Sequence, residues 1–288
     1  MSAARLPDRA VIKVSGPQAA SFLDGLVTCD LEPGGDVPPR FGALLTPQGK
    51  ILFDFIAHRT SDADGAVFFL DTPAATAADF AKRLAFYKLR AKVAVADLSG
   101  ELAVLAGWDA DPIPAETGLV GPDPRLPRLG WRAIVAASDA AEFANAEASA
   151  YHAHRIACGV PEGGRDYLFA QTFPHEALMD QLGGVDFQKG CYVGQEVVSR
   201  MQHRGTARTR ILPARYADAL APETGVDVVA GDKVIGKAGS AAEGTGLVMV
   251  RLDRIADAVE AGAPITAGGR PLTLARPDWI RFETPGVG

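Results

Sequence analysis

The octapeptide from Lys189 to Glu196, Lys-Gly-Cys-Tyr-Val-Gly-Gln-Glu, gathers residue types that could do chemistry. An ammonium beside a thiol lowers the thiol pKa and raises its thiolate fraction, so Lys189 makes Cys191 a candidate nucleophile or metal ligand. Gly190 allows backbone conformations that other residues lack, or a close approach to a ligand. Free cysteine is also among the most buried residue types. The residue types alone therefore favour a buried cysteine in a tight turn.

The residues that follow the octapeptide predict the element that positions it. Val197, Val198 and Met201 recur at helical spacing, which predicts that Gly194 opens a helix. Glu196 then falls in the first turn, where the helix dipole favours a carboxylate. We expect Gln195 and Glu196 to organise the turn that presents Cys191, by accepting hydrogen bonds from backbone N–H groups.

The other cysteines and the histidines give no further framework. Cys29, Cys158 and Cys191 are widely spaced and form no Cys-x-x-Cys pair, so neither a disulfide framework nor a zinc ribbon is indicated. We expect Cys29 to be a packed residue and Cys158 to be buried on an alanine-rich helix. The histidine spacing predicts no self-contained metal site. A metal or cluster shared with a partner protein stays open, with Cys191 as a possible ligand.

The bulk composition limits the class of protein. The chain has 288 residues, of which 48% are hydrophobic and 22% charged, which is typical of a globular protein with two or three domains. The chain has a formal net charge of −6 and so lacks the excess of positive charge that is typical of nucleic-acid-binding proteins. We therefore expect no direct nucleic-acid partner. The sequence shows neither a signal peptide nor an apolar stretch that could span a membrane. These observations predict a reduced, cytoplasmic protein without membrane contacts.

The first third of the chain predicts an α+β plait. Apolar runs at 41–46 and 51–57 flank Pro47-Gln48-Gly49-Lys50, which indicates a β-hairpin. The remaining expected elements are strands at 10–14, 66–70 and 93–98, a helix after Pro17 and an amphipathic helix at 76–90.

The rest of the chain predicts two further modules. Residues 109–128 are rich in proline and glycine and are expected to form a loop or lid, followed by a strand at 131–136 and a helix at 139–158. Residues 159–188 read as irregular, which often marks a functional loop. After Gly205, short apolar runs separated by glycine and aspartate predict a small β-barrel. We predict three domains, residues 1–98, 99–205 and 206–288, of which the second carries the octapeptide.

Several segments in a fixed order resemble the folate-binding YgfZ family, which comprises relatives of the glycine-cleavage T-protein (an aminomethyltransferase) and is linked to tRNA modification and to iron–sulfur assembly factors. The octapeptide is similar to the family's cysteine-bearing motif. The other matching segments, which precede it in the expected order, are 22–30, 43–54, 86–93, 155–161 and 173–177.

The resemblance implies an α+β fold with two ferredoxin-like plaits and a C-terminal β-barrel, arranged as a cloverleaf around a central channel. It implies that tetrahydrofolate or a related folate binds there. It also implies a role in the assembly or repair of iron–sulfur clusters, with the assembly machinery or client iron–sulfur enzymes as partners.

The resemblance also assigns candidate site residues. Cys191 would be the functional thiol, as nucleophile, redox sensor or shared cluster ligand. Lys189 would tune this thiol or bind the glutamate tail of folate, and its structural alternative is a surface charge. Glu176 would accept hydrogen bonds from the donor-rich edge of a pterin, although it could equally cap a turn. The remaining candidates for the folate site, each with a structural alternative in packing, capping or surface ion pairing, are Asp54, Tyr87, Arg155, Tyr192, Gln195 and Glu196.

One departure from the T-protein pattern affects the expected activity. T-proteins carry two adjacent aspartates at the hairpin, whereas this chain has Phe53-Asp54 and so lacks one candidate base. We therefore predict a folate-binding accessory protein for iron–sulfur cluster assembly or repair rather than a classical enzyme. The alternatives are a folate-dependent aminomethyl transferase and a folate-binding scaffold without chemistry.

Overall fold

A computed structural model describes residues 2–31, 37–205 and 207–287 of the chain. The chain divides into two compact units, one of residues 1–151 with 182–196, the other of residues 152–181 with 197–288. Met1, Thr206 and Gly288, which stand at the ends of the three predicted domains, lie outside the described residues. The three-domain division stays a prediction.

A five-stranded antiparallel sheet with the order β3-β4-β5-β2-β6 forms one half of the first unit. Its strands are β2 (Arg9–Ser15), β3 (Arg40–Leu45), β4 (Ile51–Asp62), β5 (Gly65–Pro73) and β6 (Ala94–Asp97). The predicted hairpin is confirmed as β3 and β4, and its turn closes with a 2.8 Å bond from the Thr46 N–H to the Lys50 carbonyl. Gly49 has φ +81° in this turn, a conformation that favours glycine.

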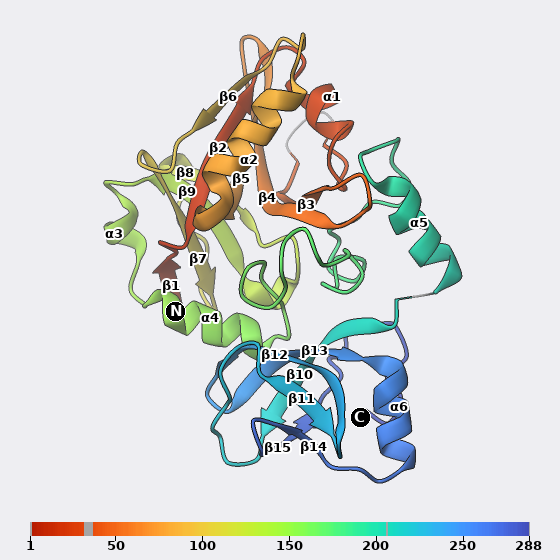
Figure 1. Ribbon diagram of the computed structural model, residues 1–288. Coiled ribbons are helices and arrows are strands. Elements are labelled where there is room, and N and C mark those ends of the chain that lie inside the picture. The colour runs from red at the N-terminus through yellow and green to blue at the C-terminus, as the bar shows by residue number, and fades with distance from the viewer. Residues whose placement is uncertain (1, 32–36, 206, 288) are drawn as a thin grey trace. The chain divides into compact units, whose positions relative to one another are not determined.

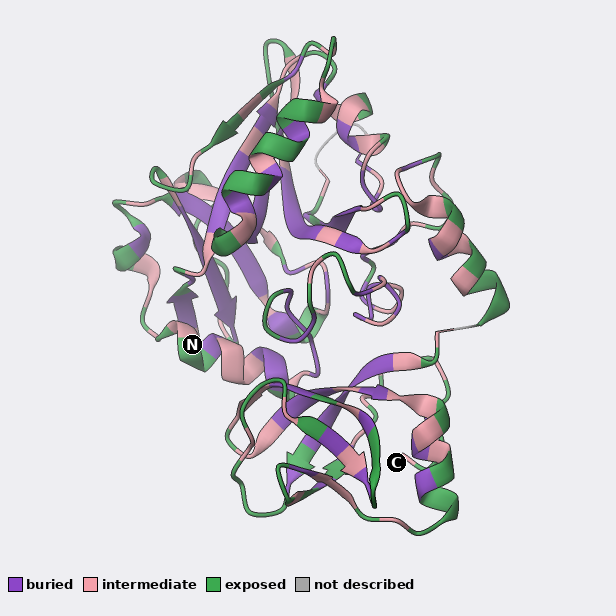
Figure 2. Cartoon of the chain, in the orientation of Figure 1, coloured by how far each residue is buried: buried purple, intermediate pink, exposed green. Residues whose placement is uncertain are grey.

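Two helices pack on this sheet, α1 (Ala19–Asp24) and α2 (Ala74–Tyr87). In α2 the buried residues Ala77, Phe80 and Leu84 recur at helical spacing and form the inner stripe. Phe80 stacks on Phe53 of β4 with ring centroids 4.8 Å apart. The sheet beneath α2 is largely buried, whereas the outward side of the helix is exposed (Figures 1 and 2).

A second antiparallel sheet of the same unit has the order β1-β7-β9-β8. It consists of β1 (Ser2–Arg5), β7 (Leu102–Trp108), β8 (Gly118–Pro122) and β9 (Trp131–Ala136). The predicted loop at 109–128 therefore contains an edge strand, together with two short 3-10 helices at Ala115–Thr117 and Pro127–Leu129. A proline is tolerated there because an edge strand has no partner on its outer side.

The predicted helix at 139–158 is interrupted. It consists of α3 (Ala140–Phe143) and α4 (Ala148–Ala157). Between them, the N–H groups of Asn145 and Ala146 both donate to the carbonyl of Ala3, at 2.9 and 3.0 Å. The Asn145 side chain accepts the Ala3 N–H at 2.9 Å. Pairing with β1 thus replaces the helical hydrogen bonds that the alanine-rich sequence favours.

The second unit contains a closed β-barrel with the order β10-β13-β12-β11-β14-β15. Its strands are β10 (Thr209–Tyr216), β11 (Asp227–Ala230), β12 (Lys233–Ala242), β13 (Thr245–Arg251), β14 (Ile265–Ala267) and β15 (Arg270–Leu274). The α+β class with a small C-terminal barrel is therefore confirmed. Strand β14 and helix α6 (Leu252–Glu260) were not predicted from the sequence; Ile255 and Ala258 of α6 are buried.

Helix α5 (Gln195–Arg204) begins directly after Gly194, and Glu196 lies in its first turn, as predicted. Among the helices of residues 2–31, 37–205 and 207–287, none combines the length and the apolar character needed to cross a bilayer.

Candidate functional site

The loop that leads to Cys191 runs along the segment that follows α1. The Thr28 hydroxyl donates to the Gly184 carbonyl at 2.6 Å, and the Asp186 N–H donates to the Thr28 carbonyl at 2.8 Å. Thr28 is fully buried and also accepts the Ala43 N–H of β3 through its hydroxyl, at 2.9 Å. The loop is thereby attached to the five-stranded sheet through one buried threonine.

Lys189 holds the next part of the loop. Its ammonium Nζ lies 2.7 Å from Oδ1 of Asp24, and it donates to the carbonyls of Asp24, Val27 and Cys29 at 2.8, 3.0 and 2.8 Å. The Lys189 side chain is 2% exposed. A buried ammonium is stable only when oxygen atoms satisfy its charge and its donors, and these four acceptors do so. Lys189 thus joins the Cys191 loop to the end of α1.

The far side of the loop rests on the β3–β4 turn. Gly194 has φ +80°, and a Cβ at this position would lie 2.6 Å from the Thr46 carbonyl oxygen and 3.0 Å from the Gly49 Cα. Only glycine fits such a close approach. At Gly190, by contrast, a Cβ would meet no described atom within 4 Å and φ lies outside the left-handed region.

The side chains on either side of Cys191 close the loop. Gln195 donates through its side-chain amide to the Gly190 carbonyl at 3.3 Å, whereas the prediction was that it accepts hydrogen bonds from backbone N–H groups. Tyr192 is buried beneath Lys189, whose Nζ lies 5.7 Å from the ring centroid. Burial and the neighbouring Asp186 raise the pKa of Tyr192 to about 12. The Tyr192 hydroxyl finds no hydrogen-bond partner among the described residues.

The three cysteines lie in different environments. Cys191 is exposed, Cys158 is partly exposed and Cys29 is buried. Burial raises the pKa of Cys29 to about 12, against the smaller lowering effect of Lys189. The expectation of a packed Cys29 is confirmed, whereas Cys158 follows the end of α4 and is not buried as expected. A buried cysteine at 191, which the residue types favoured, is wrong. The accessible thiol at the centre of the octapeptide is Cys191.

Asp54 and Tyr87 lie elsewhere in the first unit. Phe53 points into the core, so strand alternation turns Asp54 to the opposite face of the sheet, where it is 4% exposed. Tyr87 is the last residue of α2 and packs against the hydrophobic core, with its ring centroid 6.0 Å from that of Phe86.

Arg155 and Glu176 belong to the second unit. Arg155 is fully buried, and its guanidinium donates to Asp166, Ser240 and the Val160 carbonyl at 2.8, 3.0 and 3.1 Å. It therefore forms a buried ion pair rather than the surface pair considered as its structural alternative. The carboxylate of Glu176 accepts the Phe173 N–H at 2.8 Å, which agrees with the capping alternative.

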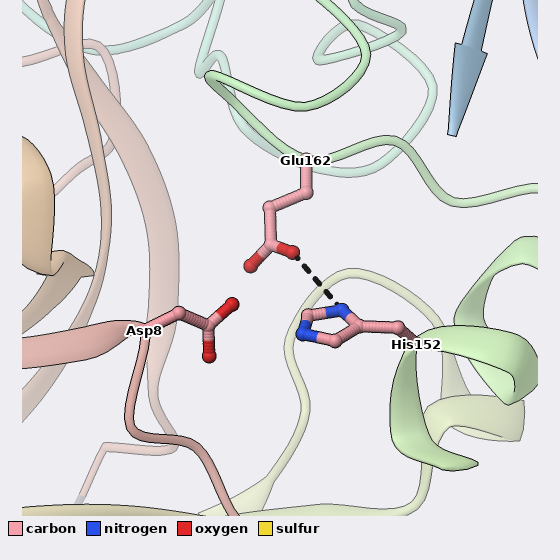
Figure 3. A group of neighbouring side chains, drawn as sticks. All are labelled: Asp8, His152 and Glu162. Carbon is pink, nitrogen blue, oxygen red and sulfur yellow. Dashed lines mark ion pairs between the residues drawn. The ribbon is translucent and has the colours of Figure 1, made fainter. Parts of the chain in front are cut away.

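His152 and Glu162 lie close to each other and to Arg155. Figure 3 shows the His152 ring facing the Glu162 carboxylate, and the two groups are 3.3 Å apart. The guanidinium groups of Arg155 and Arg165 lie 3.3 and 3.5 Å from the same carboxylate. Two fixed positive charges on one carboxylate disfavour a metal cation there, because like charges repel at this range.

Two features of the first unit were not predicted from the sequence. One is the pair Asp24 and Thr28, which fix the loop that carries Cys191. The other is a cluster of buried charged residues. Arg9 pairs with Asp71 at 2.6 Å, and Arg125 pairs with Asp123 at 2.6 Å, all four side chains being nearly inaccessible. Arg132 contacts both aspartates at 3.6 Å. The signal that could have found this cluster is a charged residue inside an apolar strand, as at Asp71 and Arg132.

Comparison with known proteins first defines the class. The fold matches the crystal structure of the glycine cleavage system aminomethyltransferase T from Bartonella henselae, with a TM-score of 0.75 over 99% of this chain and 87% of that one. Their sequence identity of 16% shows a shared fold alone. Residues 208–282 match the family model of the CAF17 C-terminal beta-barrel domain.

Sequence relatives define the family. The human iron–sulfur cluster assembly factor IBA57, named mitochondrial, is 31% identical over 96% of this chain and 84% of its own length. IBA57 homologues of Chaetomium globosum and Mycosarcoma maydis are each 36% identical, over 80% and 76% of this chain. The chain belongs to the IBA57 family. The resemblance to iron–sulfur assembly factors is confirmed, under the name IBA57 rather than YgfZ.

Two further facts come from the same relatives. The matches cover 60% and 58% of the lengths of the Chaetomium globosum and Mycosarcoma maydis proteins. The relatives are named mitochondrial, which contradicts the predicted cytoplasmic location. That prediction relied on the absence of a recognisable leader, which is a weak signal for location.

Proposed function

We propose that this chain is an accessory protein for iron–sulfur cluster assembly or repair in which Cys191 is the functional thiol. One observation carries the proposal: the loop of Cys191 is fixed at both sides by Lys189 and Gly194, yet the cysteine itself is exposed. A packed structural cysteine would need no such support. The iron–sulfur assembly role named for the IBA57 relatives agrees with it.

In this proposal Lys189 is a positioning residue. Its donors are directed to Asp24 and to three carbonyls, so it acts by holding the loop rather than by touching a substrate. Cys191 would then meet a cluster or a thiol carried by a partner of the assembly machinery, since cysteine-ligated clusters take about four thiolates.

Tetrahydrofolate is the proposed small-molecule ligand. In the first unit, the buried Tyr192 hydroxyl, which has no partner among the described residues, suits a pterin, because a pterin carries both donors and acceptors. In the second unit, Glu176 stays a candidate. Arg155 suits this role less well, because its donors serve its own chain. Asp54, Tyr87, Gln195 and Glu196 remain candidates. When bound, a folate would supply a one-carbon carrier.

The aminomethyl transferase alternative has the shared fold in its favour. Against it, the position of the second aspartate of T-proteins holds Phe53, which is 6% exposed and stacked on Phe80. A carboxylate there would be buried in an apolar core at high cost. Turnover of an aminomethyl donor by the pure protein with tetrahydrofolate would support the transferase.

Two experiments test the halves of the proposal. For the thiol, Cys191→Ala is expressed in cells that lack the wild-type copy, and an iron–sulfur enzyme is assayed; full rescue would remove the thiol role. For the folate, tetrahydrofolate is titrated into pure wild type, Glu176→Gln and Tyr192→Phe. We expect weaker binding to both variants, and undetectable binding to wild type would contradict the folate role.

A further inference from the structure

The C-terminal end of α2 carries two large apolar side chains on the surface of the first unit. Phe86 is 70% exposed and Leu89 is 86% exposed. The inner stripe of α2 ends with Leu84, and Phe86 lies two residues further, about 200° around the helix axis. Phe86 therefore points away from the sheet that α2 covers, which agrees with its exposure.

The backbone holds Leu89 in an unusual conformation. Leu89 has φ +41°, which is rare and costly for a bulky residue without a functional or packing reason. Hydrogen bonds fix the turn around it: the Ala91 N–H donates to the Lys88 carbonyl at 2.6 Å, and the Lys92 N–H donates to the Gln18 side chain at 2.7 Å. The structure thus maintains a strained turn that places a leucine in solvent.

Positive charge surrounds the two apolar side chains. Residues 82–92 contain five basic residues and no acidic one, in a chain whose net charge is −6. Arg83 lies one helical turn before Phe86 on the same face. The side chains of Arg83, Arg90 and Lys92 make no hydrogen bond or ion pair with a described residue, whereas Lys82 pairs with Asp79 at 3.3 Å. We call Arg83, Phe86, Leu89, Arg90 and Lys92 the Phe86 surface.

We infer that the Phe86 surface docks an acidic partner protein, in whose apolar pocket Phe86 and Leu89 insert. Aromatic and arginine side chains are enriched at such interfaces, and unpaired cations around an apolar centre fit a negatively charged rim. Rigid placement of both side chains by the turn suits a pocket of fixed shape. A fluid bilayer gains nothing from that rigidity.

The test uses the full chain. Benzoylphenylalanine replaces Phe86 in cells, a matched probe replaces the exposed Leu220 of the barrel unit, and the proteins crosslinked by light are identified. The identified protein is then purified and titrated against wild type and three variants. These are the double variant Phe86→Ser with Leu89→Ser, the double variant Arg83→Glu with Arg90→Glu, and the control Leu220→Ser. We expect at least a tenfold loss of affinity in both double variants, none in the control, and weaker binding at high salt.

Three results would overturn the inference. They are a crosslinking pattern identical to that of the Leu220 probe, a crosslink to a second copy of this chain, and binding to phosphatidylserine vesicles in place of a protein. The inference does not use Cys191. If wild type does not bind the crosslinked protein while Cys191→Ala loses activity, this inference alone is contradicted. If wild type binds that protein while Cys191→Ala is fully active, the proposed function alone is contradicted.

Discussion

The ammonium of Lys189 lies 2.7 Å from the carboxylate of Asp24, although 165 residues separate them in the chain. The Lys189 side chain is 2% exposed and that of Asp24 is 15% exposed. This pair joins the octapeptide to the end of α1, so the position of Cys191 depends on it.

Lys189→Met is expected to destabilise the protein. It removes the ammonium from three carbonyls and from the Asp24 carboxylate, which keeps only the Leu31 N–H at 3.1 Å. The loss of one partner of a buried pair typically costs roughly 3 kcal/mol. The free energy of unfolding in urea measures the loss. Lys237→Met is the matched control, because the Lys237–Asp227 pair is 2.7 Å long but 61% and 48% exposed. Equal effects of the two substitutions would contradict the structural role of Lys189.

The two glycines of the octapeptide are expected to respond differently to alanine. Gly194→Ala places a Cβ against the backbone of the β3–β4 turn and should lower the free energy of unfolding by about 1–3 kcal/mol. Gly190→Ala has open space and should leave the melting temperature unchanged. A stable Gly190→Ala variant that loses function would indicate that a ligand or partner approaches this glycine. A loss of stability at Gly190 would contradict the described loop.

Alkylation should distinguish the cysteines. In the native protein at pH 8, iodoacetamide should modify Cys191 readily and leave Cys29 unmodified, because Cys29 is buried and its pKa is raised to about 12 by that burial. Peptide mass spectrometry measures both sites, and the unfolded protein in urea provides the reference in which all cysteines react. Modification of Cys29 at the rate of Cys191 in the native state would refute the assigned burial.

Stability is expected to fall in mild acid, in part because of His58. Burial lowers the pKa of His58 to about 4, while Asp71 acts in the opposite direction. The unfolded chain, with a pKa near 6.5, then binds more protons than the folded one between these values. The contribution of His58, about 3 kcal/mol, is complete above pH 6.5 and is lost as pH falls towards 4.

Urea unfolding between pH 4 and 7 checks this prediction in wild type, His58→Gln and the exposed control His203→Gln. His58→Gln should reduce the dependence of the free energy of unfolding on pH. Part of the dependence should remain, because burial also lowers the pKa of His175. Equal slopes in wild type and His58→Gln would show that His58 does not titrate as its burial requires.

Local sequence signals predicted much of the fold. The hairpin at Pro47–Lys50, the inner stripe of α2 and the helix after Gly194 each follow from a few neighbouring residues, and the structure contains all three. The misses have tertiary causes. The alanine-rich helix at 139–158 breaks where Asn145 pairs with Ala3, and β8 forms in a proline-rich loop because β9 offers it an edge.

The site could be predicted only in part for the same reason. The octapeptide identified Cys191, but residue types alone favoured a buried thiol. Its exposure depends on Thr28 and Asp24, which lie far from it in the chain. The role of Arg155 was also invisible, because its partner Ser240 is 85 residues away.

The most direct test of the central claim is the activity of an iron–sulfur enzyme in cells that lack the wild-type chain and carry either Cys191→Ala or Cys158→Ala at matched protein levels. We expect Cys191→Ala to give activity near that of the empty vector and Cys158→Ala to restore the wild-type level. Full activity with Cys191→Ala would contradict the claim.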